Sequence, residues 1–597
     1  MFTKTLQLVR LVMVLSALCI FFFGSPVLAT IPGCDVTDLQ ALAPITPWPL
    51  TITSATDTAA VAVPPTPEYC DVVGYVTTNG EGAGPGKAGF EVGIPAPSTW
   101  NGKYLFLGNG GLAGSLSLAA GSEGLQKGYA VATTDMGHTA IPPTNSFYGN
   151  WALLAPGVPN TPALIDYYYR ATHQTTLVGK QFVTAYYRRY GGNGTISRSY
   201  YQGCSTGGRQ GLLEAERYPY DFDGLIAGDP VANFSHQAPS NTNAEFAILR
   251  PCTAWIPLSL LPVIDAATYA QCDPNHVGVI QNPAVCSFDP QSLLCTGKNG
   301  PNCLTQDQVN GLTRYARPLL DEWGRVVMPG YPLTDLSFPD GWFWIMTLGL
   351  EEPSCVPTNP EPWDLPPYYY TPVHWAASDG TFPYFVFLTE SYNQQDFPIT
   401  FEGDTGVIAE WALQLNDRRT DLGDTTYPYL LEGFAEGRSK MILYHGFSDP
   451  LISPYQTVQL YKDTASITPG GYRRLQENIR LFMVPGMMHC GGGPGPNTFD
   501  MLTALEKWVE HGDAPDAIIA TGSPTSNCPT TDTARTMPLC KFPEVATYKG
   551  SGDICVAANW TCNPYNNDLL ELGYDGHLAG LPYSYVTPGP GVPAYAP

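Results

Sequence analysis

Three residues of this chain have the types and the order needed to activate a nucleophile. Ser205 lies in the pentapeptide Gly203-Cys204-Ser205-Thr206-Gly207, and Asp449 and His489 follow it along the chain. A histidine oriented by a carboxylate can take the proton of a serine hydroxyl, which then attacks a carbonyl carbon. A Gly-x-Ser-x-Gly turn exposes such a serine between a strand and a helix, and the order serine, acid, histidine is that of α/β-hydrolases. We therefore predict a catalytic triad of Ser205, Asp449 and His489.

Each of these residues follows a segment with the pattern of a strand. Residues 199–202 (SYYQ) precede the serine turn, and residues 206–217 (TGGRQGLLEAER) continue it as an expected helix. Residues 440–445 (KMILYH) and 479–484 (IRLFMV) are short apolar runs ended by turn residues, so we expect buried strands there. Taken singly, the acid could be a turn residue and the histidine a loop residue. Their order and flanking segments favour the triad, and the expected fold class is α/β.

A glycine-rich turn could complete the site. Gly108-Asn109-Gly110-Gly111 follows the strand-like residues 104–107 (YLFL). Backbone N–H groups stabilise the negative charge that develops on an attacked carbonyl oxygen. We expect one such donor from Thr206, the residue after the nucleophile, and a second from this turn. Asn109 is favoured for the second donor, with Gly108 and Gly110 as alternatives.

Two cysteines stand next to triad residues. Cys204 precedes the serine and Cys490 follows the histidine. If Ser205 and His489 lie within hydrogen-bond reach, a disulfide between these neighbours is geometrically feasible. Such a bond would clamp the nucleophile loop to the base loop.

This constellation resembles the tannase and feruloyl esterase family, which also contains mono(hydroxyethyl) terephthalate hydrolase. The resemblance covers most of the chain and rests on residues 201–210 (YQGCSTGGRQ), 442–449 (ILYHGFSD) and 484–495 (VPGMMHCGGGPG). Residues 100–103 (WNGK), which lead into the glycine-rich turn, and 548–553 (YKGSGD) agree as well. The resemblance implies an α/β-hydrolase core with a large inserted lid domain, and a serine carboxylic ester hydrolase.

The resemblance also implies a set of disulfides. The implied pairs are Cys34–Cys70, Cys204–Cys490, Cys272–Cys286, Cys295–Cys303 and Cys540–Cys562. The partners of Cys252, Cys355, Cys528 and Cys555 stay open.

Spacing along the chain locates the insertion. The interval between Ser205 and Asp449 is far longer than that between Asp449 and His489, and longer than a few strand–helix units require. We place a lid at residues 235–428, which matches the lid of the resembled family. The catalytic core would then comprise residues 30–234 and 429–597.

The N-terminus and the cysteine content predict secretion. Lys4 and Arg10 flank an apolar run over residues 11–23, and Val27-Leu28-Ala29 fits a signal-peptidase site, so residues 1–29 are expected to be removed. Of the 15 cysteines Cys19 leaves with that segment, and the even remainder suits an oxidising compartment. In a eukaryotic host the tripeptides at Asn193, Asn233 and Asn559 would be surface glycosylation sites.

Composition excludes some partners and suggests others. The chain has 53 acidic and 29 basic residues, a formal charge of −24, which argues against nucleic acid and anionic membranes. The partner expected is a small-molecule or polysaccharide-linked aromatic ester. Between Arg325 and Arg418 there is no Lys or Arg, so a carboxylate-bearing substrate would lack an Arg clamp in that stretch.

The same stretch is rich in aromatic residues. Most of these rings should pack in the lid's own core, and some should face the cleft, where they would suit a flat acyl group. They are Trp342, Phe343, Trp344, Trp363, Tyr368, Tyr369, Tyr370, Trp375, Phe382, Tyr384, Phe385 and Phe387. The sequence therefore favours a neutral cinnamoyl, galloyl or benzoyl ester.

The cofactor prediction departs from the resembled family, whose members generally carry a lid calcium site in a disulfide-bracketed, Asp-rich loop. Here the loop between Cys272 and Cys286 is about three residues shorter than that pattern and has few carboxylates. The weak candidate ligands are Asp273, Asn275 and the carbonyls of Val279 and Ile280, a thin set for an ion that takes six to eight oxygens. We expect no required cofactor and treat calcium as doubtful.

Four functions compete at this point. A secreted feruloyl esterase or tannase leads. A dedicated esterase, lactonase or acyltransferase acting on a small secreted metabolite shares the triad, and the shortened loop leaves room for it. A serine peptidase is disfavoured by the motif match to esterases, and a silent binding protein has no reason to keep all three triad residues.

Overall fold

The structure is a computed structural model. It describes residues 31–563 except 63–64, 117, 119–122, 141–146, 287, 298–299, 339–342, 350–352, 354–371, 426–430, 432–433, 435–436, 523–527 and 529–533. The predicted signal peptide, residues 1–29, lies outside the described residues, as do Cys355, Trp342, Trp363 and Tyr368 to Tyr370.

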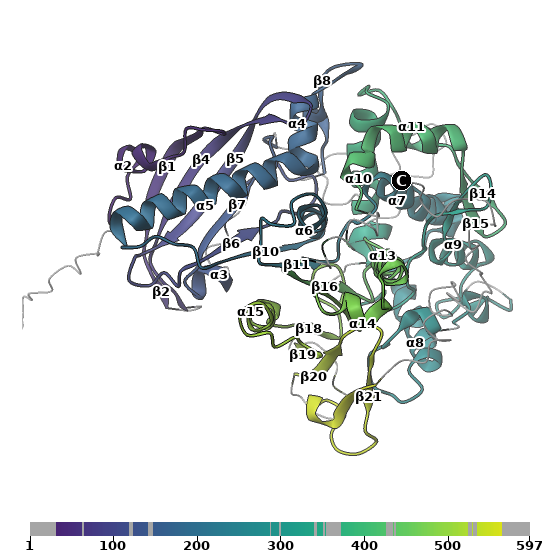
Figure 1. The fold of residues 1–597 in the computed structure, drawn as a ribbon. Helices are drawn as coiled ribbons and strands as arrows, with labels where there is room; N and C mark the ends of the chain where they lie inside the picture. Colours follow the sequence, from purple (N-terminus) through teal and green to yellow (C-terminus); the bar gives the residue numbers. More distant parts are fainter. Residues whose placement is uncertain are drawn as a thin grey trace, which may run out of the picture.

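A nine-stranded sheet forms the centre, in the order β1-β4-β5-β7-β6-β10-β11-β16-β17 (Figure 1). The first three strands pair antiparallel with their neighbours, and the six from β7 to β17 run parallel. This is the predicted α/β fold class. The bounds are β1 Leu50–Thr58, β4 Tyr69–Gly80, β5 Ala83–Pro95, β6 Lys103–Leu107, β7 Ala130–Thr134, β10 Arg198–Cys204, β11 Gly224–Gly228, β16 Lys440–Gly446 and β17 Ile479–Val484.

Burial along the strands follows their place in the sheet. All residues of β11 and β17 are buried, whereas β4 alternates between buried and less buried positions over most of its length. Parallel strands need cover on both faces, and antiparallel strands at an edge can leave one face to water. The helices α5 (Ala171–Tyr190), α6 (Thr206–Arg217) and α13 (Pro454–Ile467) share one hydrophobic core with the sheet. The helices α3 (Glu123–Gln126) and α15 (Met501–His511) contribute to a second core with it.

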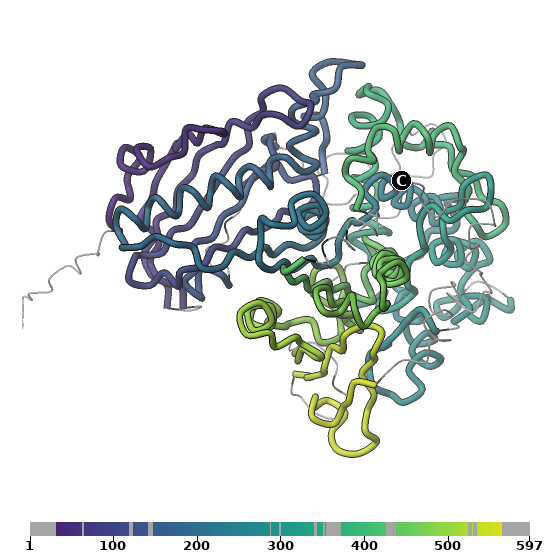
Figure 2. The backbone as a smooth tube through the Cα atoms, viewed as in Figure 1, coloured from purple at the N-terminus to yellow at the C-terminus, as the bar shows by residue number. Residues whose placement is uncertain are grey.

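Between β11 and β16 the chain leaves the sheet and builds the insertion, coloured teal to green in Figure 2. Its helices are α7 Phe234–Leu249, α8 Leu261–Cys272, α9 Gln306–Ala316, α10 Val373–Thr381 and α11 Glu410–Thr420. A four-stranded sheet accompanies them, in the order β13 Val326–Met328, β12 Leu319–Asp321, β15 Thr405–Ile408 and β14 Ile399–Glu402.

The two ends of the insertion meet. The backbone N–H of Thr425 donates to the carbonyl of Ala232 at 2.7 Å, and the hydroxyl of Ser235 donates to Oδ2 of Asp424 at 2.7 Å. These contacts lie close to the boundaries at 235 and 428 predicted from spacing. The division into a core domain and a lid domain stays a prediction.

The C-terminal part adds two small sheets below the main one (Figure 1). One contains β18 Pro496–Thr498, β19 Ala517–Gly522 and β20 Thr536–Cys540, and the other contains β21 Val545–Tyr548 and β22 Trp560–Asn563. Val277 and Val279 of the insertion pack on Met537 and Trp560 of these sheets. Shorter elements are α2 Val36–Leu42, β2 Val61–Ala62, β3 Pro65–Thr66, β8 Leu153–Ala155, β9 Val158–Pro159, α4 Thr161–Ile165 and α14 Gly471–Leu475.

Six disulfides are found among the described residues. They comprise the five pairs implied by the family resemblance together with Cys528–Cys555, whose pairing was open. Cys252 is also disulfide-bonded.

The predicted glycosylation sites differ in accessibility. Asn193 is exposed. The side-chain nitrogen of Asn233 lies 2.9 Å from Nδ1 of His236, and that of Asn559 donates to the carbonyl of Asp553 at 2.8 Å. Asn233 and Asn559 are half-buried, and glycosylation at the three sites stays a prediction.

None of the described helices is by itself long and apolar enough to cross a membrane. Phe234–Leu249 and Cys252–Cys272 reach the required length and composition only jointly, with a bend of 89° between them.

Candidate active site

Ser205 occupies a strained turn between β10 and α6. Its backbone angles, φ 64° and ψ −125°, lie in a region that residues with a side chain rarely adopt. Glycines allow the close packing around it: a Cβ on Gly203 would lie 2.6 Å from the carbonyl of Gly207, and one on Gly208 would lie 2.3 Å from the carbonyl of Gly228. The local sequence thus builds the strained strand-to-helix turn that the motif predicts, and the role of Ser205 as nucleophile stays a prediction.

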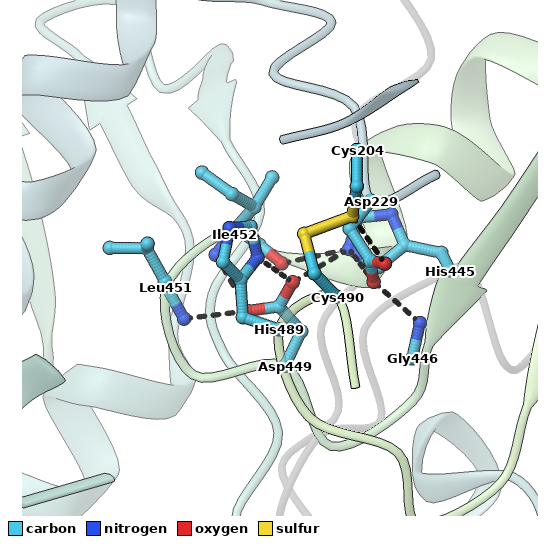
Figure 3. The surroundings of a disulfide bond; sticks show 9 residues. All are labelled: Cys204, Asp229, His445, Gly446, Asp449, Leu451, Ile452, His489 and Cys490. Atoms are coloured by element: carbon cyan, nitrogen blue, oxygen red, sulfur yellow. Dashed lines mark hydrogen bonds and ion pairs between the residues drawn. A yellow bond between two sulfur atoms is a disulfide. The ribbon is translucent and has the colours of Figure 1, made fainter. Parts of the chain in front are cut away.

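Asp449 and His489 meet at the carboxyl ends of β16 and β17, as Figure 3 shows. Nδ1 of His489 lies 2.7 Å from Oδ2 of Asp449. The other carboxylate oxygen, Oδ1, accepts the backbone N–H groups of Leu451 at 2.8 Å and Ile452 at 3.0 Å. Asp449 is fully buried and His489 is 7% exposed. The predicted acid and base are therefore paired in a site shielded from bulk water.

The electrostatics of this pair favour an ionised acid beside a basic histidine. Burial opposes ionisation of Asp449, but the charge and hydrogen bonds of His489 and His445 outweigh it and hold the pKa of Asp449 well below its usual range. Burial also works against a protonated His489, yet Asp449 and, more weakly, Asp229 raise the pKa of His489 above its ordinary value. His489 is thus a stronger base than a free histidine.

The disulfide Cys204–Cys490 joins the nucleophile loop to the base loop. Its two Cα atoms are 5.9 Å apart, and the bond closes a chain interval of 286 residues. Cys204 immediately precedes Ser205 and Cys490 immediately follows His489, so the bond ties the two loops directly at the site (Figure 3).

The glycine-rich turn, residues 108–111, directly follows β6. The backbone N–H groups of its first two residues already have hydrogen-bond partners. The backbone N–H of Asn109 donates to Oε1 of Gln210 at 2.9 Å, and that of Gly108 donates to the carbonyl of Gln202 at 2.9 Å. Asn109 is therefore not available as an oxyanion donor, contrary to the prediction, and Gly108 is excluded for the same reason. Of the residues considered, Gly110 remains.

Thr206 ties the two donor segments together. Its hydroxyl donates to the carbonyl of Gly111 at 2.6 Å, across the gap between the nucleophile turn and the glycine-rich turn. Gly111 and Thr206 both line the cavity that contains Ser205. The hydrogen bond thus holds the start of α6 against the glycine-rich turn at this cavity.

A cavity of about 530 Å³, counted with the space open to solvent, lies over Ser205. It is mainly apolar, and the described residues lining it include no Lys, Arg, Asp or Glu. The lining residues are Gly111, Leu112, Phe147, Tyr167, Ser205, Thr206, Val231, Phe234, Gln237, Ala238, Asn241, Ala377, Thr381, Leu451 and Ile452.

The rings in this wall differ from those the sequence suggested. They are Phe147, Tyr167 and Phe234, of which Phe234 is the first residue of α7. The buried guanidinium of Arg209 lies behind the last two, 4.7 Å from the ring centre of Tyr167 and 4.8 Å from that of Phe234. Five of the described lid rings do not line the cavity and are buried in hydrophobic clusters: Phe343, Trp375, Phe382, Tyr384 and Phe385. Phe385 packs behind the cavity wall, its ring centre 6.0 Å from that of Tyr167 and 6.2 Å from that of Phe234. The expectation that lid rings face the cleft is not met by these five.

The loop considered for calcium is organised by its own backbone. Oδ1 of Asp273 accepts the N–H of Val277 at 2.8 Å, and Oδ2 accepts the N–H of Gly278 at 2.6 Å. Asn275 is exposed, whereas Val279 and Ile280 are buried. Both oxygens of the one carboxylate among the four candidates already serve the loop, so these residues do not fit a calcium site, and the absence of a required cofactor stays a prediction.

Two buried residues beside the triad were not assigned a role from the sequence. Asp229 directly follows β11, and His445 belongs to β16; both are fully buried. The position of Asp229 after an apolar run is the same signal that pointed to Asp449, so it could have been found.

Comparison with known proteins identifies the family. A model of tannase and feruloyl esterase matches residues 70–563. The chain belongs to the tannase and feruloyl esterase family. It is therefore a carboxylic ester hydrolase.

Similar proteins agree with this family. The chain is 32% identical over 549 residues to an uncharacterized esterase of Xanthomonas campestris, covering 86% of this chain and 88% of that one. It is 31% identical over 547 residues to the mono(2-hydroxyethyl) terephthalate hydrolase of Piscinibacter sakaiensis, covering 83% and 85%. The crystal structure of feruloyl esterase B from Aspergillus oryzae shares the fold, with a TM-score of 0.67 at 23% identity, covering 88% of this chain and all of that one.

Proposed function

We propose that the protein is a secreted serine esterase that cleaves esters of phenolic or other aromatic acids through an acyl-enzyme. The observation that carries the proposal is the 2.7 Å contact between Nδ1 of His489 and Asp449, at the same sheet edge as a serine in a strained turn. Secretion is supported by the six disulfides among the described residues, because such bonds persist mainly in oxidising compartments.

The geometry supports the following reaction. The N–H of Nδ1 of His489 donates a hydrogen bond to Asp449, which leaves the lone pair of Nε2 free. Nε2 takes the proton of the Ser205 hydroxyl as Oγ of Ser205 attacks the ester carbonyl. The N–H groups of Thr206 and Gly110 would stabilise the charge that forms on the carbonyl oxygen. His489 then gives its proton to the departing alcohol, and the acyl group stays on Ser205. Water repeats the sequence, releasing the acid.

The cavity wall supports a neutral acyl group. An apolar wall with the rings of Phe147, Tyr167 and Phe234 suits a flat aromatic acid. A relative is named for a terephthalate monoester, whose free carboxylate needs a cationic partner. Since no Lys or Arg is among the described lining residues, that substrate should be poor here.

The test is hydrolysis of methyl ferulate, methyl gallate, a p-nitrophenyl alkanoate and mono(2-hydroxyethyl) terephthalate by the wild type and by Ser205→Ala. Turnover of the phenolic esters that falls at least about 1000-fold in the variant is the expected result. Turnover of the p-nitrophenyl alkanoate alone would contradict the assignment of phenolic esters as substrates. It would favour a dedicated esterase, lactonase or acyltransferase. Absence of any turnover by the wild type would overturn the proposed function.

A further inference from the structure

Two ionisable residues lie behind the triad and take no part in the reaction described above. Asp229 and His445 are fully buried, and neither is among the residues that line the cavity over Ser205. Figure 3 shows both beside Asp449, on the side away from the ring of His489. Burying a carboxylate and an imidazole has a substantial cost unless each is hydrogen-bonded, so their contacts define what they do.

His445 holds the same carboxylate oxygen that orients the catalytic base. Its Nε2 lies 3.0 Å from the carbonyl oxygen of Ile452 and 3.3 Å from Oδ2 of Asp449. A carbonyl oxygen can only accept, so the ring hydrogen must sit on Nε2. Nδ1 lies 2.8 Å from the hydroxyl of Thr457, which fixes the ring from its other end. Oδ2 of Asp449 is therefore held from two sides, by His445 and by His489.

Asp229 places a second carboxylate next to this arrangement. Its Oδ1 accepts the backbone N–H of Gly446 at 2.8 Å and lies 3.6 Å from Nε2 of His445. Its Oδ2 lies 3.3 Å from Sγ of Cys204, which is in a disulfide and has no hydrogen to donate. The backbone of Asp229 has φ 37°, an uncommon conformation for a residue with a side chain. Backbone hydrogen bonds to Tyr444 and Gly446 of β16 thus hold Asp229 in place.

Several titratable groups face this pair. Asp229 is influenced by His445 and Asp449, both from the β16 segment, and by His489 after β17, and it acts in turn on Tyr444 of β16. His489 is influenced by Asp449 and Asp229, and its own charge acts on His374 of α10. Burial raises the pKa of Asp229 to about 6, with His445 opposing the rise and Asp449 adding to it. The pKa of His374 is lowered by burial to about 4, so this ring is neutral near pH 7.

We propose that Asp229 and His445 are positioning residues of the triad: His445 fixes the Asp449 carboxylate against His489, and the charge of Asp229 sets the pH range in which His489 is a base. The inference rests on the proposed serine-esterase mechanism. It assigns no contact with substrate to either residue.

The sign of the effect follows from the charges. A carboxylate oxygen of Asp229 lies within 4.8 Å of a ring nitrogen of His489, so an ionised Asp229 favours the protonated form of His489 and raises the pKa of His489. The free enzyme needs His489 unprotonated, so kcat/KM falls as the pH drops through that pKa. Removing the charge of Asp229 lowers the pKa of His489, and the acid limb of the profile moves to lower pH.

The first experiment compares the pH profiles of kcat/KM for wild type, Asp229→Asn and Asp135→Asn. Asparagine at position 229 keeps an acceptor for Gly446. Asp135 is the matched control, because it also directly follows a strand, β7, is buried, and has a pKa raised by burial to about 6, but it accepts the N–H groups of Gly89 and Gly137 instead of contacting the triad. The acid limb should move down by about one pH unit in Asp229→Asn and stay in place in Asp135→Asn. An unmoved limb in Asp229→Asn, or an equal shift in the control, would overturn the role of Asp229.

A second readout separates this inference from the proposed function. The rate at which diisopropyl fluorophosphate labels Ser205 depends on the same protonation of His489 and needs no ester substrate. If the wild type hydrolyses no ester, the proposed function fails, and the labelling profile still tests the shift. If esters turn over, and the acid limbs of the kcat/KM and labelling profiles lie at the same pH in Asp229→Asn as in the wild type, only the present inference fails.

The third experiment tests His445 through the separation of kcat from KM. His445→Leu removes the donor to Asp449, and kcat should fall about 10- to 100-fold with KM unchanged, because the ring does not line the cavity. His445→Gln keeps a side-chain N–H at the reach of Nε2 and should recover most of kcat. If the leucine variant does not fold, His445→Asn serves in its place, since its shorter amide reaches Thr457 but not Asp449. A glutamine variant as slow as the leucine or asparagine variant would contradict the positioning role.

Discussion

The buried residues around Asp449 and the lining of the cavity over Ser205 differ in chemistry. At the sheet edge, Asp229, Asp449, His445 and His489 are ionisable, buried and hydrogen-bonded to one another or to backbone. From the insertion, α7 and α10 contribute the uncharged side chains Phe234, Gln237, Ala238, Asn241, Ala377 and Thr381 to the cavity. The comparison separates two regions: ionisable groups are concentrated around Asp449, and the lining that the insertion contributes to the cavity is neutral.

The insertion is nevertheless more than a cover. The side chains of Gln237 and Tyr315 donate to the carbonyls of Leu451 and Pro450, at 3.1 and 3.2 Å. The hydroxyl of Ser453 donates to the carbonyl of Gly330 at 2.7 Å. These hydrogen bonds surround Asp449, so the insertion also holds the loop that carries the acid.

The largest effect is expected among the buried ionisable residues, from Asp449→Asn. An amide in this position can no longer hold His489 in the tautomer that leaves Nε2 free, and kcat should fall by about 10⁴-fold with KM little changed. Asp135→Asn, which changes a buried carboxylate outside the triad, should leave kcat within about twofold. Steady-state kinetics on methyl ferulate provide the measurement, and a loss of less than about tenfold would remove Asp449 from the triad.

The second effect concerns the disulfide Cys204–Cys490 beside these residues. Replacing both Cys204 and Cys490 by serine should lower the free energy of unfolding by about 2–5 kcal/mol and reduce kcat, since the loops of Ser205 and His489 lose their link. The control is the double serine variant of Cys295 and Cys303, a bond that closes only 8 residues within the insertion. Denaturant unfolding and kinetics compare the two, and equal losses of activity would show that the clamp has no special place in the site.

A smaller effect is expected from the neutral wall. Phe234→Leu removes a ring from the cavity, so kcat/KM for methyl ferulate should fall about tenfold relative to that for a p-nitrophenyl alkanoate. Phe397→Leu is the matched control, because that ring is equally part of the insertion but stacks on Phe382, 4.0 Å away, outside the cavity. Equal ratios of the two substrates in wild type and Phe234→Leu would assign selectivity to other residues.

The smallest effect is expected at the loop between Cys272 and Cys286. Incubation with EDTA should leave kcat and the unfolding midpoint unchanged, because both oxygens of Asp273 are occupied by backbone N–H groups. Asp273→Ala should lower the free energy of unfolding by about 1–3 kcal/mol, since two buried or half-buried amides lose their acceptor. A loss of stability on chelation that added calcium restores would contradict the metal-free loop.

Much of the site could be predicted because its signals are local. A strand of apolar residues ended by turn residues reports its own burial, and the motif around Ser205 fixes a strained turn through the glycines that flank it. The positions of Cys204 and Cys490 next to Ser205 and His489 made a bond between them feasible, and the family resemblance implied it. The fold class and the order of the triad depend on nothing more distant than these segments.

Other features required the folded chain. The hydrogen-bond partner of the Asn109 amide is Gln210, which lies 101 residues further along the chain. The rings that line the cavity come from three separate segments, and the aromatic stretch of the insertion sends its described rings into cores instead.

The sequence by itself therefore determined which residues could react and which strands deliver them, because strand and turn preferences act between neighbours. The tertiary structure alone decided which amides are already hydrogen-bonded, which rings line the cavity, and that Asp229 and His445 lie beside Asp449. Those properties depend on partners that the chain brings together only when its sheet is assembled, since a hydrogen bond acts over about 3 Å whatever the separation in sequence.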